Sequence, residues 1–402
     1  MSAETTNMNG KNTPPGKEDA SGPRFSLFAR RHQKGVTFDQ LNQWQLMGLR
    51  FRQHKLAVGA FFILLGLYLV AMFAEFVAPQ HKMHRNLNYA YCPPHQIAFS
   101  VEKGIHVKGL RQTTDPITLR KEYRRAPELD APLGFFVRGD TYDFWGLFKW
   151  DRHLFGVDYA DLDVPKGASP EDFGFHFLGA DQYGRDLFSR IVYGARISLS
   201  VGLIGIGVAF ILGMIFGGVS GYVGGRTDLL VQRGIEILNA FPRLPMWLAL
   251  GAAIPGDWSP LKGYFAITVV LSFLSWTGLA RVIRGKMLSL REEEYALAAK
   301  LLGANNCRII FRHLLPGFTS HIIVALTLAI PGMVLGETSL SFLGLGLRPP
   351  IVSWGVLLQD CMDIKAVSYY PWLMAPVVAI ILTVLCFNFV GDGLRDAADP
   401  YH

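Results

Sequence analysis

Long apolar runs limit what this chain can fold into more than any other feature of its sequence. The run over residues 56–78, LAVGAFFILLGLYLVAMFAEFVA, is about 23 residues long, and a helix of about 20 apolar residues crosses a bilayer. Half of all residues are hydrophobic and only 18% are charged, which is typical of membrane proteins and unlike a soluble domain. Further clear apolar runs lie at 197–223, 265–279, 322–335 and 371–390.

A sixth, more polar crossing is predicted over residues 229–254. The first half of that segment carries Arg233, Glu236, Asn239 and Arg243. Those charges alone would favour a helix at the membrane surface. However, Lys and Arg collect on the cytoplasmic side of membrane proteins, and both residues 30–55 and residues 281–312 are rich in them. Both regions are cytoplasmic only if residues 229–254 cross, so we expect six spans with both termini and residues 294–316 in the cytoplasm.

This topology divides the chain into four parts. Residues 1–55 form a polar cytoplasmic tail that we expect to be partly disordered, residues 56–78 form the first span, and residues 191–402 hold the other spans. Residues 79–190 lie between the first two spans and would form an extracytoplasmic insertion. The insertion is rich in aromatic residues, unlike disordered chain, and its Pro and Gly punctuation predicts short strands and turns.

Neither the histidines nor the cysteines predict a metal site. His81 and His84 stand three residues apart, as metal ligands can, but no carboxylate or cysteine stands near them in the sequence, and a solvated pair is the simpler interpretation. The four cysteines are far apart. Cys92 and Cys361 could both face the oxidising side, and whether they pair stays open.

Small residues recur at every fourth position of the second predicted span. They are Gly205, Ala209, Gly213, Gly217, Gly221 and Gly225. On a helix this spacing forms one stripe, which lets another backbone approach closely. The stripe predicts either a crossing against a moving, gating helix or static packing inside the bundle.

A polar stretch, EYALAAKLLGANNCRIIFRHLLP, interrupts the apolar runs at residues 294–316. Residues 292–302 are good helix formers, and Gly303 offers a stop. Tyr295, Ala298, Ala299 and Leu302 lie on one face of that helix at i, i+3, i+4 and i+7. A face with such small residues would fit a cleft on another protein, although an amphipathic helix lying on lipid headgroups has the same spacing.

This stretch resembles the EAA loop in the permease subunits of binding-protein-dependent ABC importers, whose pattern is EAA, three residues, Gly, nine residues, Ile-x-Leu-Pro. The matching residues are Ala298, Ala299, Gly303, Leu315 and Pro316. Leu297 and His313 depart from the pattern, so Leu297 cannot supply an acidic contact. The resemblance implies a coupling loop at residues 285–318 that sits in a cleft of an ATPase subunit. It assigns that contact to Glu294, Tyr295, Ala298, Ala299 and Gly303.

Three further blocks are similar to the dipeptide and oligopeptide permease branch, specifically its C-type subunit. They are LGADQYGRDLFSR at 178–190, ETSLSFLGLGLRPPIVSWG at 337–355 and GDGLRDAADP at 391–400. The insertion, with FFVRGDTYDFWGLFKWDRHLFG, is similar to the Yej-type subgroup. The resemblance implies an all-α membrane protein with the six-helix type I ABC importer permease fold, interrupted by the insertion between helices 1 and 2.

The resemblance also implies partners. The chain has no G-x-x-x-x-G-K-[ST] motif, so it would bind no cofactor itself, and ATP and Mg would be bound by two ATP-binding subunits or one fused ATPase. A second, B-type permease subunit, a periplasmic substrate-binding protein and membrane lipid complete the expected partners. The net charge of +7 marks cytoplasmic loops and predicts no nucleic-acid binding. The implied location is a bacterial inner membrane.

Glu337 lies near the outer end of a predicted span. A carboxylate within a membrane is a functional candidate, so Glu337 could line the path or latch a gate. A structural hydrogen bond to the turn that follows it is an equally good interpretation. Two alternative functions are a stand-alone secondary transporter, which commonly needs internal repeats, and, less favoured, a membrane-embedded hydrolase, for which no H-E-x-x-H motif is present.

Overall fold

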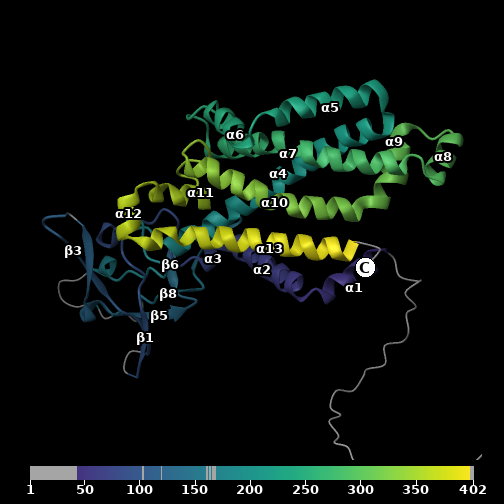
Figure 1. The fold of residues 1–402 in the computed structure, drawn as a ribbon. Coiled ribbons are helices and arrows are strands. Elements are labelled where there is room, and N and C mark those ends of the chain that lie inside the picture. The colour runs from purple at the N-terminus through teal and green to yellow at the C-terminus, as the bar shows by residue number, and fades with distance from the viewer. Residues whose placement is uncertain are drawn as a thin grey trace, which may run out of the picture.

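A bundle of long helices and a smaller β-rich unit at one of its ends make up the chain (Figure 1). The structure, a computed structural model, describes residues 43–398 apart from 102–103, 119, 160–161, 163 and 165–168. The predicted disorder of the first residues lies outside this part of the chain. Within it, five helical segments are long and apolar enough to cross a membrane: Lys55–Met72, Leu187–Val223, Pro260–Leu290, Asn306–Phe342 and Pro371–Ala398.

The helices follow the apolar runs of the sequence. Their bounds are α1 Gln43–Gln53, α2 Lys55–Met72, α3 Ala74–Val77, α4 Leu187–Val223, α5 Gly225–Ala240, α6 Arg243–Ala252, α7 Pro260–Leu290, α8 Glu294–Leu301, α9 Asn306–Arg308, α10 Thr319–Phe342, α11 Trp354–Leu357, α12 Ile364–Tyr369 and α13 Ala375–Ala398. Capping residues determine where a helix such as α4 begins and ends. Asp186 caps its first turn by accepting the Ser189 N–H at 2.7 Å, and Gly224, with a φ of 69°, ends it.

The polar segment 229–254 folds as two helices rather than one. The chain breaks between α5 and α6 at Phe241 and Pro242, because proline lacks the N–H that a continuing helix would need. Together the two helices run along the bundle from the end where α8 and α9 lie to the end that holds the β-rich unit (Figure 1). Neither is long and apolar enough by itself to be a membrane span, so the sixth crossing stays a prediction.

The insertion contains the short strands that its Pro and Gly residues predict. The strands are β1 Ile97–Ser100, β2 Gly104–Val107, β3 Leu110–Thr114, β4 Lys121–Arg125, β5 Ala131–Phe135, β6 Arg138–Phe144, β7 Phe148–Arg152 and β8 Phe155–Val157. An antiparallel sheet has the order β1-β2-β5-β8, and β3–β4 and β6–β7 are separate hairpins. Its core includes Val107, Leu129, Phe173 and Phe175. An all-α description therefore fits the bundle but not the insertion.

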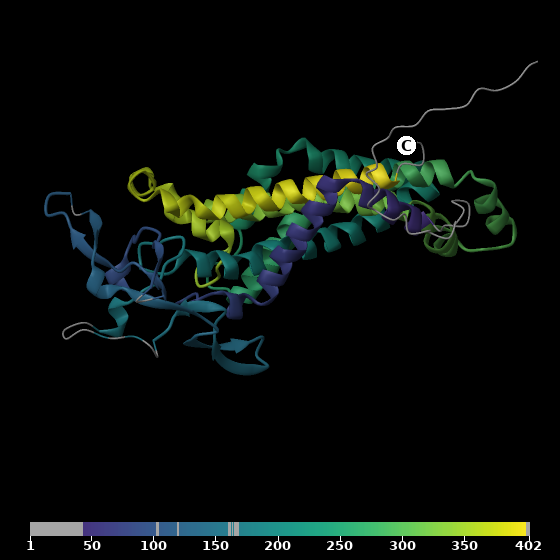
Figure 2. The ribbon, with the colours of Figure 1, turned by 90° about the horizontal axis from the view of Figure 1, so that it is seen from below.

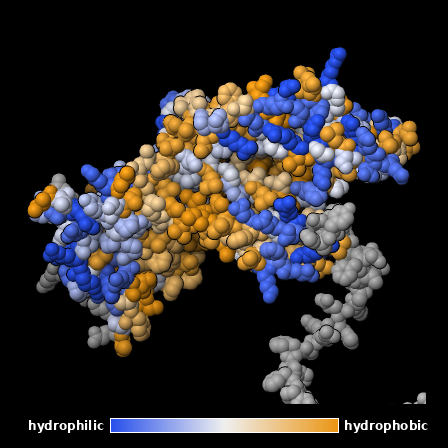
Figure 3. Space-filling view, in the orientation of Figure 1, coloured by the Kyte–Doolittle hydropathy of each residue, from blue (hydrophilic) through white to orange (hydrophobic). Residues whose placement is uncertain are grey.

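The insertion and the short helices between the spans lie at the two ends of the bundle. The insertion lies at one end, whereas α1, the C-terminal end of α13 and the α8–α9 region lie at the other (Figures 1 and 2). Hydrophilic side chains gather at both ends, and apolar ones cover much of the middle (Figure 3). This distribution is what a multi-pass membrane protein requires, because its middle faces hydrocarbon and its ends face water.

Candidate functional site

The predicted coupling segment projects from the end of the bundle opposite the insertion (Figure 1). Helix α8 ends in a Schellman motif, in which the Gly303 N–H donates to the Lys300 carbonyl at 3.0 Å and the Ala304 N–H to the Ala299 carbonyl at 3.1 Å. Gly303 has a φ of 82°, a conformation that glycine adopts without strain. The stop that the sequence predicts at Gly303 is thus present.

The two faces of α8 differ from the prediction. Ala299 and Ala296 are buried in a cluster of the chain's own residues, so Ala299 does not belong to an outward face. Glu294, Tyr295, Ala298 and Gly303 are exposed. The most exposed apolar side chains of this segment are Leu301, the last residue of α8, and Leu302, its C-cap, each 88% exposed. Sequence reasoning placed Leu302 on the helix face but did not identify Leu301, because a glycine-terminated helix leaves its last apolar residues uncovered in a way that spacing alone does not reveal.

A continuous apolar cluster joins this segment to the spans. It contains Leu279, Ile283 and Met287 of α7, Ala296 and Ala299 of α8, and Ile309, Ile310, Leu314, Phe318 and Ile322 further along the chain. After α9, π-helical turns over Ile309–Leu314 and 3₁₀ turns over Leu315–Phe318 lead directly into α10. Because close-packed apolar side chains transmit displacements, a shift of α8 would be passed to α7 and α10.

An ion pair that the sequence analysis did not identify lies at the same end of the bundle. The Arg284 guanidinium of α7 donates two hydrogen bonds of 2.5 Å to the Asp228 carboxylate of α5. Ser220, near the end of α4, donates a third to Asp228 at 2.5 Å. These bonds tie three helices together, and the Arg284 guanidinium neutralises the charge of Asp228. The two residues are 56 positions apart, so no local pattern could reveal the pair.

The small-residue stripe packs against α7. A Cβ atom added at Gly217 would lie 2.4 Å from the Ala280 carbonyl oxygen, and one at Gly221 would lie 2.8 Å from the Arg284 carbonyl oxygen. At Gly205, the Ser272 hydroxyl of α7 donates to the glycine carbonyl at 3.0 Å. The stripe also includes Ala209, which is fully buried, and Gly213, whose Cβ would be 3.1 Å from Leu279. Helices α4 and α7 thus approach backbone to backbone, as small residues permit.

Gly225 does not belong to this stripe. It follows the α4 cap and begins α5, and an added Cβ would meet no atom within 4 Å. Its φ of 58° shows the reason for a glycine at this position, since the chain turns there in a left-handed conformation. The recurrence of a small residue at every fourth position therefore continues to Gly225 in the sequence, although helix α4 ends before it.

Glu337 is fully buried in α10 and accepts three serine hydroxyls. Ser353 and Ser341 donate to its Oε1 at 2.7 Å and 2.8 Å, and Ser198 of α4 donates to its Oε2 at 3.0 Å. Each hydroxyl in turn accepts a backbone N–H: Ser198 from Trp354, Ser341 from Leu347, and Ser353 from Val356. The carboxylate therefore joins α4, α10 and the segment leading into α11. The predicted bond to the turn after Glu337 is present as Ser341, while a role in the path stays a prediction.

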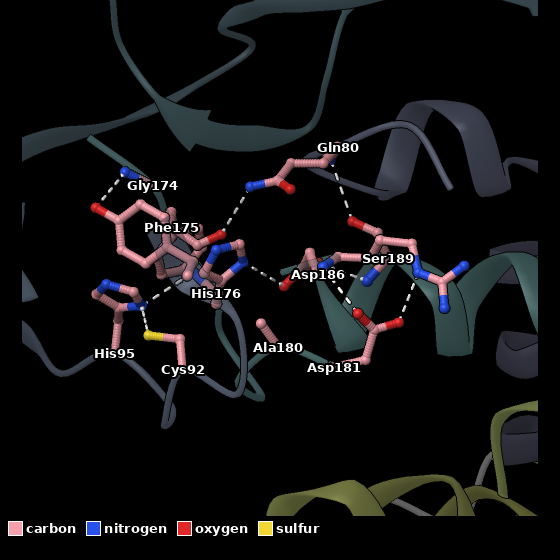
Figure 4. Close-up of polar contacts among 12 residues, drawn as sticks. Gln80, Cys92, His95, Gly174, Phe175, His176, Ala180, Asp181, Asp186 and Ser189 are labelled. Carbon is pink, nitrogen blue, oxygen red and sulfur yellow. Dashed lines mark hydrogen bonds and ion pairs between the residues drawn. The ribbon is translucent and has the colours of Figure 1, made fainter. Parts of the chain in front are cut away.

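A second buried network fixes the start of α4 to the insertion (Figure 4). The Asp181 carboxylate accepts the Tyr183 and Arg185 N–H groups at 2.8 and 3.0 Å, and it also pairs with the guanidinium groups of Arg185 and Arg190. The block at 178–190 supplies all four of these residues. The resemblance singled out this block, but its sequence gave no indication that Asp181 would pair with two buried arginines.

The contacts of Figure 4 continue toward α2. Asp186, the α4 cap, lies 3.6 Å from a ring nitrogen of the buried His176. Gln80, just beyond α3, donates its backbone N–H to the Ser189 hydroxyl at 3.1 Å and its side-chain amide to the Phe175 carbonyl at 3.1 Å. The outer ends of α2 and α4 are therefore bound to each other and to the insertion.

The histidines and cysteines of the insertion have structural partners. His84 is not merely solvated, because its ring nitrogen lies 3.1 Å from Asp140, and this hydrogen bond raises the pKa of His84. No cluster of three or more metal-binding side chains occurs among the described residues. Cys92 and Cys361 are both free. Burial raises the pKa of the Cys92 thiol, so the thiolate form is disfavoured.

Comparison with known proteins agrees with this arrangement. Residues 209–401 match the family of binding-protein-dependent transport system inner membrane components, and residues 42–94 match the N-terminal membrane domain of oligopeptide transport permease C. Among solved structures, an amino acid ABC transporter crystallised with histidines covers 51% of this chain and 92% of its own at 16% identity, with a TM-score of 0.38, too low to support an argument about the fold.

Curated relatives match more than half of the chain. The oligopeptide transport system permease protein OppC of Haemophilus influenzae is 42% identical over 61% of this chain and 78% of its own length. The dipeptide transport system permease protein DppC of Bacillus subtilis is 42% identical over 56% and 68%. The glutathione transport system permease protein GsiD of Pectobacterium atrosepticum is 38% identical over 62% and 81%. The chain therefore belongs to the inner membrane permeases of binding-protein-dependent transport systems, in the branch of the oligopeptide and dipeptide C-type permeases.

Proposed function

We propose that this chain is one of two permease subunits of an ABC importer that moves peptides or peptide-like compounds across a bacterial inner membrane. The relatives are named for oligopeptide, dipeptide and glutathione transport, and all three cargoes are peptides. The cargo class proposed for this chain is the one that these relatives share. A periplasmic binding protein would deliver the peptide and determine which one is carried.

The proposed topology has six crossings, with α5 and α6 together forming the third. The course of these two helices along the bundle supports this (Figure 1). The polar first half of the segment lies at the α8–α9 end, where Arg284 already pairs with Asp228. Both termini and the coupling segment would then be cytoplasmic, and the insertion would be periplasmic.

The observation that carries the proposed coupling is the exposure of Leu301 and Leu302 at the tip of α8. Each is 88% exposed, so no residue of the described part of the chain covers either of them. Fully burying a leucine side chain contributes about 1.5–3 kcal/mol, so a partner that covered both would gain substantially. We propose that a cleft of an ATPase subunit covers them, with Glu294, Tyr295, Ala298 and Gly303 at the edge of the contact.

Movement would reach the membrane through the apolar cluster below α8. When the ATPase subunits close around ATP and Mg, α8 would shift, and the cluster would pass this shift to α7 and α10. Helix α10 carries Glu337, which is bonded to α4 through Ser198. The spans would thereby rock between inward- and outward-open states around a path shared with the second permease.

The docking proposal can be tested with a charge at the tip of α8. Leu302→Glu should abolish copurification of the ATPase subunits with the complex, because the cleft would have to desolvate a carboxylate. Val101→Glu is the matched control, since Val101 is 97% exposed in the insertion at the opposite end. Retention of the ATPase subunits by Leu302→Glu at the level of Val101→Glu would contradict the docking proposal.

A further inference from the structure

The β6–β7 hairpin of the insertion exposes several large apolar side chains, most of them aromatic, at and near its tip. Trp145, Leu147 and Phe148 are 55%, 77% and 51% exposed, and Trp150 on β7 is also exposed. The turn places Trp145 at a φ of 52° and Gly146 at 72°. A left-handed conformation is rare for a bulky residue and costs energy, so the turn holds Trp145 in place at the expense of backbone strain.

The hairpin lies beside the outer end of the membrane-spanning helix α2 (Figures 1 and 2). The Trp145 indole N–H donates to the Met72 carbonyl, the last residue of α2, at 3.0 Å. Phe73 stacks on Phe144 at 5.9 Å between ring centroids, and Phe76 stacks on Trp150 at 6.1 Å. These contacts fix the height of the hairpin relative to the point where α2 leaves the hydrocarbon.

The hairpin is amphipathic. Tyr142 pairs with Trp150 and Phe144 with Phe148 across the strands, so these four aromatic residues share one face. Strand alternation places Asp143, Lys149 and Asp151 on the opposite face. An aromatic face that lies against the end of a span, with charges directed away from it, resembles the aromatic belts that membrane proteins place at the lipid–water boundary.

We propose that the tip of the β6–β7 hairpin, residues 144–148, inserts into the headgroup–acyl boundary of the phospholipid leaflet on the insertion side. The exposed apolar surface of α2, with Leu65, Leu69 and Met72 at i, i+4 and i+7, continues directly into the tip. Arg196 of α4, whose guanidinium pairs with the Glu75 carboxylate of α3 at 2.5 Å, stacks on the Trp145 ring at 4.4 Å from its centroid and so holds this ring beside the end of α2. This membrane contact depends on the spanning position of α2 and not on the peptide cargo.

A lipid surface explains the hairpin better than a soluble partner does. The exposed aromatics adjoin the exposed apolar side chains of α2, a helix long and apolar enough to cross a membrane. A lipid leaflet can cover both surfaces at once, whereas a soluble periplasmic partner could not reach the part of α2 that lies within the bilayer. The hairpin would then anchor the insertion beside α2, in addition to the buried contacts of Figure 4 that bind it to α4.

Depth-dependent fluorescence quenching tests this proposal. In the full chain with its four cysteines replaced, Leu147→Cys is labelled with an environment-sensitive fluorophore, and the assembled transporter is reconstituted in phosphatidylcholine–phosphatidylglycerol vesicles. Lipids carrying a nitroxide near the headgroup should quench this label severalfold more strongly than aqueous iodide does. Lys149→Cys, on the charged face, and Val101→Cys, far from α2, serve as controls and should be quenched mainly by iodide.

Two outcomes would overturn the proposal. If iodide quenches the label at position 147 as strongly as the label at 101, the tip lies in water. If the label at 147 is shielded from both quenchers in the assembled transporter but is reached by iodide in the chain alone, a protein subunit covers the tip instead of lipid.

Discussion

Glu337 shows how a carboxylate can be retained inside a membrane bundle. Its two oxygens accept three hydroxyls, and each of these serines accepts a backbone N–H in return, so the polar atoms of the group are satisfied without water. Two of the serines, Ser341 and Ser353, lie within the block at 337–355, which accounts for the polar residues of an otherwise apolar segment. Such a satisfied network fixes geometry, and the structural interpretation of Glu337 explains all of its contacts.

Replacing Glu337 separates a structural role from a role in the path. Glu337→Leu should destabilise the chain by about 2–4 kcal/mol, because three serine hydroxyls would lose a buried acceptor. Glu337→Gln keeps the shape of the side chain and one acceptor oxygen, so it should lower the free energy of unfolding clearly less than Glu337→Leu does. Thermal unfolding of both variants in detergent measures the difference. Unchanged stability of Glu337→Leu together with lost peptide uptake would instead identify Glu337 as a residue of the path.

The contact between His84 and Asp140 gives the insertion a pH dependence. The hydrogen bond to Asp140 raises the pKa of His84 above 6.5, so the protonated imidazolium is favoured in the folded state. Its contribution to stability is fully present below pH 6.5 and disappears as the pH rises through the higher folded pKa. Hydrogen exchange at the His81 N–H, which donates to Asp140 at 3.0 Å, should therefore quicken above that pH beyond the intrinsic rate. In His84→Gln this additional dependence should vanish, and its persistence would assign the effect to another group.

At the scale of elements, the close approach of α4 and α7 is the feature that the sequence predicted best. The fourfold spacing of small residues identified the contact face, although spacing could not reveal which helix packs there or that the stripe ends before Gly225. The face of α8 was predicted less well. Periodicity groups Ala298 with Ala299, but the chain's own cluster buries Ala299 while leaving Ala298 exposed, and such tertiary contacts are not encoded in local spacing.

Two glycines of α4 provide a matched test of this packing. Gly217→Val should destabilise the bundle by about 1–3 kcal/mol, because its Cβ would lie 2.4 Å from the Ala280 carbonyl oxygen. Gly207→Val introduces the same side chain where an added Cβ meets no atom within 4 Å, and it should change stability by less than about 0.5 kcal/mol. Thermal unfolding in detergent compares them. Equal effects at the two positions would contradict a backbone contact between α4 and α7.

At the scale of the whole molecule, buried contacts connect the two ends of the bundle. The α8 segment packs on α7 and α10, Glu337 of α10 bonds to α4, and the start of α4 is bonded to the insertion through Ser189 and Gln80. The sequence predicted the two ends of this connection, since the polar interruption and the long insertion both stand out between apolar runs. The connection itself depends on residues as distant as Ser198 and Glu337, which only the folded chain brings together.

ATP dependence of peptide uptake is the most direct test of the proposed function. The chain would be reconstituted in vesicles with the second permease, the ATPase subunits and the binding protein, and uptake of a labelled oligopeptide would be measured. Uptake is predicted to require ATP and every one of these subunits, and to stop when the ATPase subunits are omitted. Uptake by the chain alone, driven by an ion gradient without ATP, would contradict the account and identify a secondary transporter.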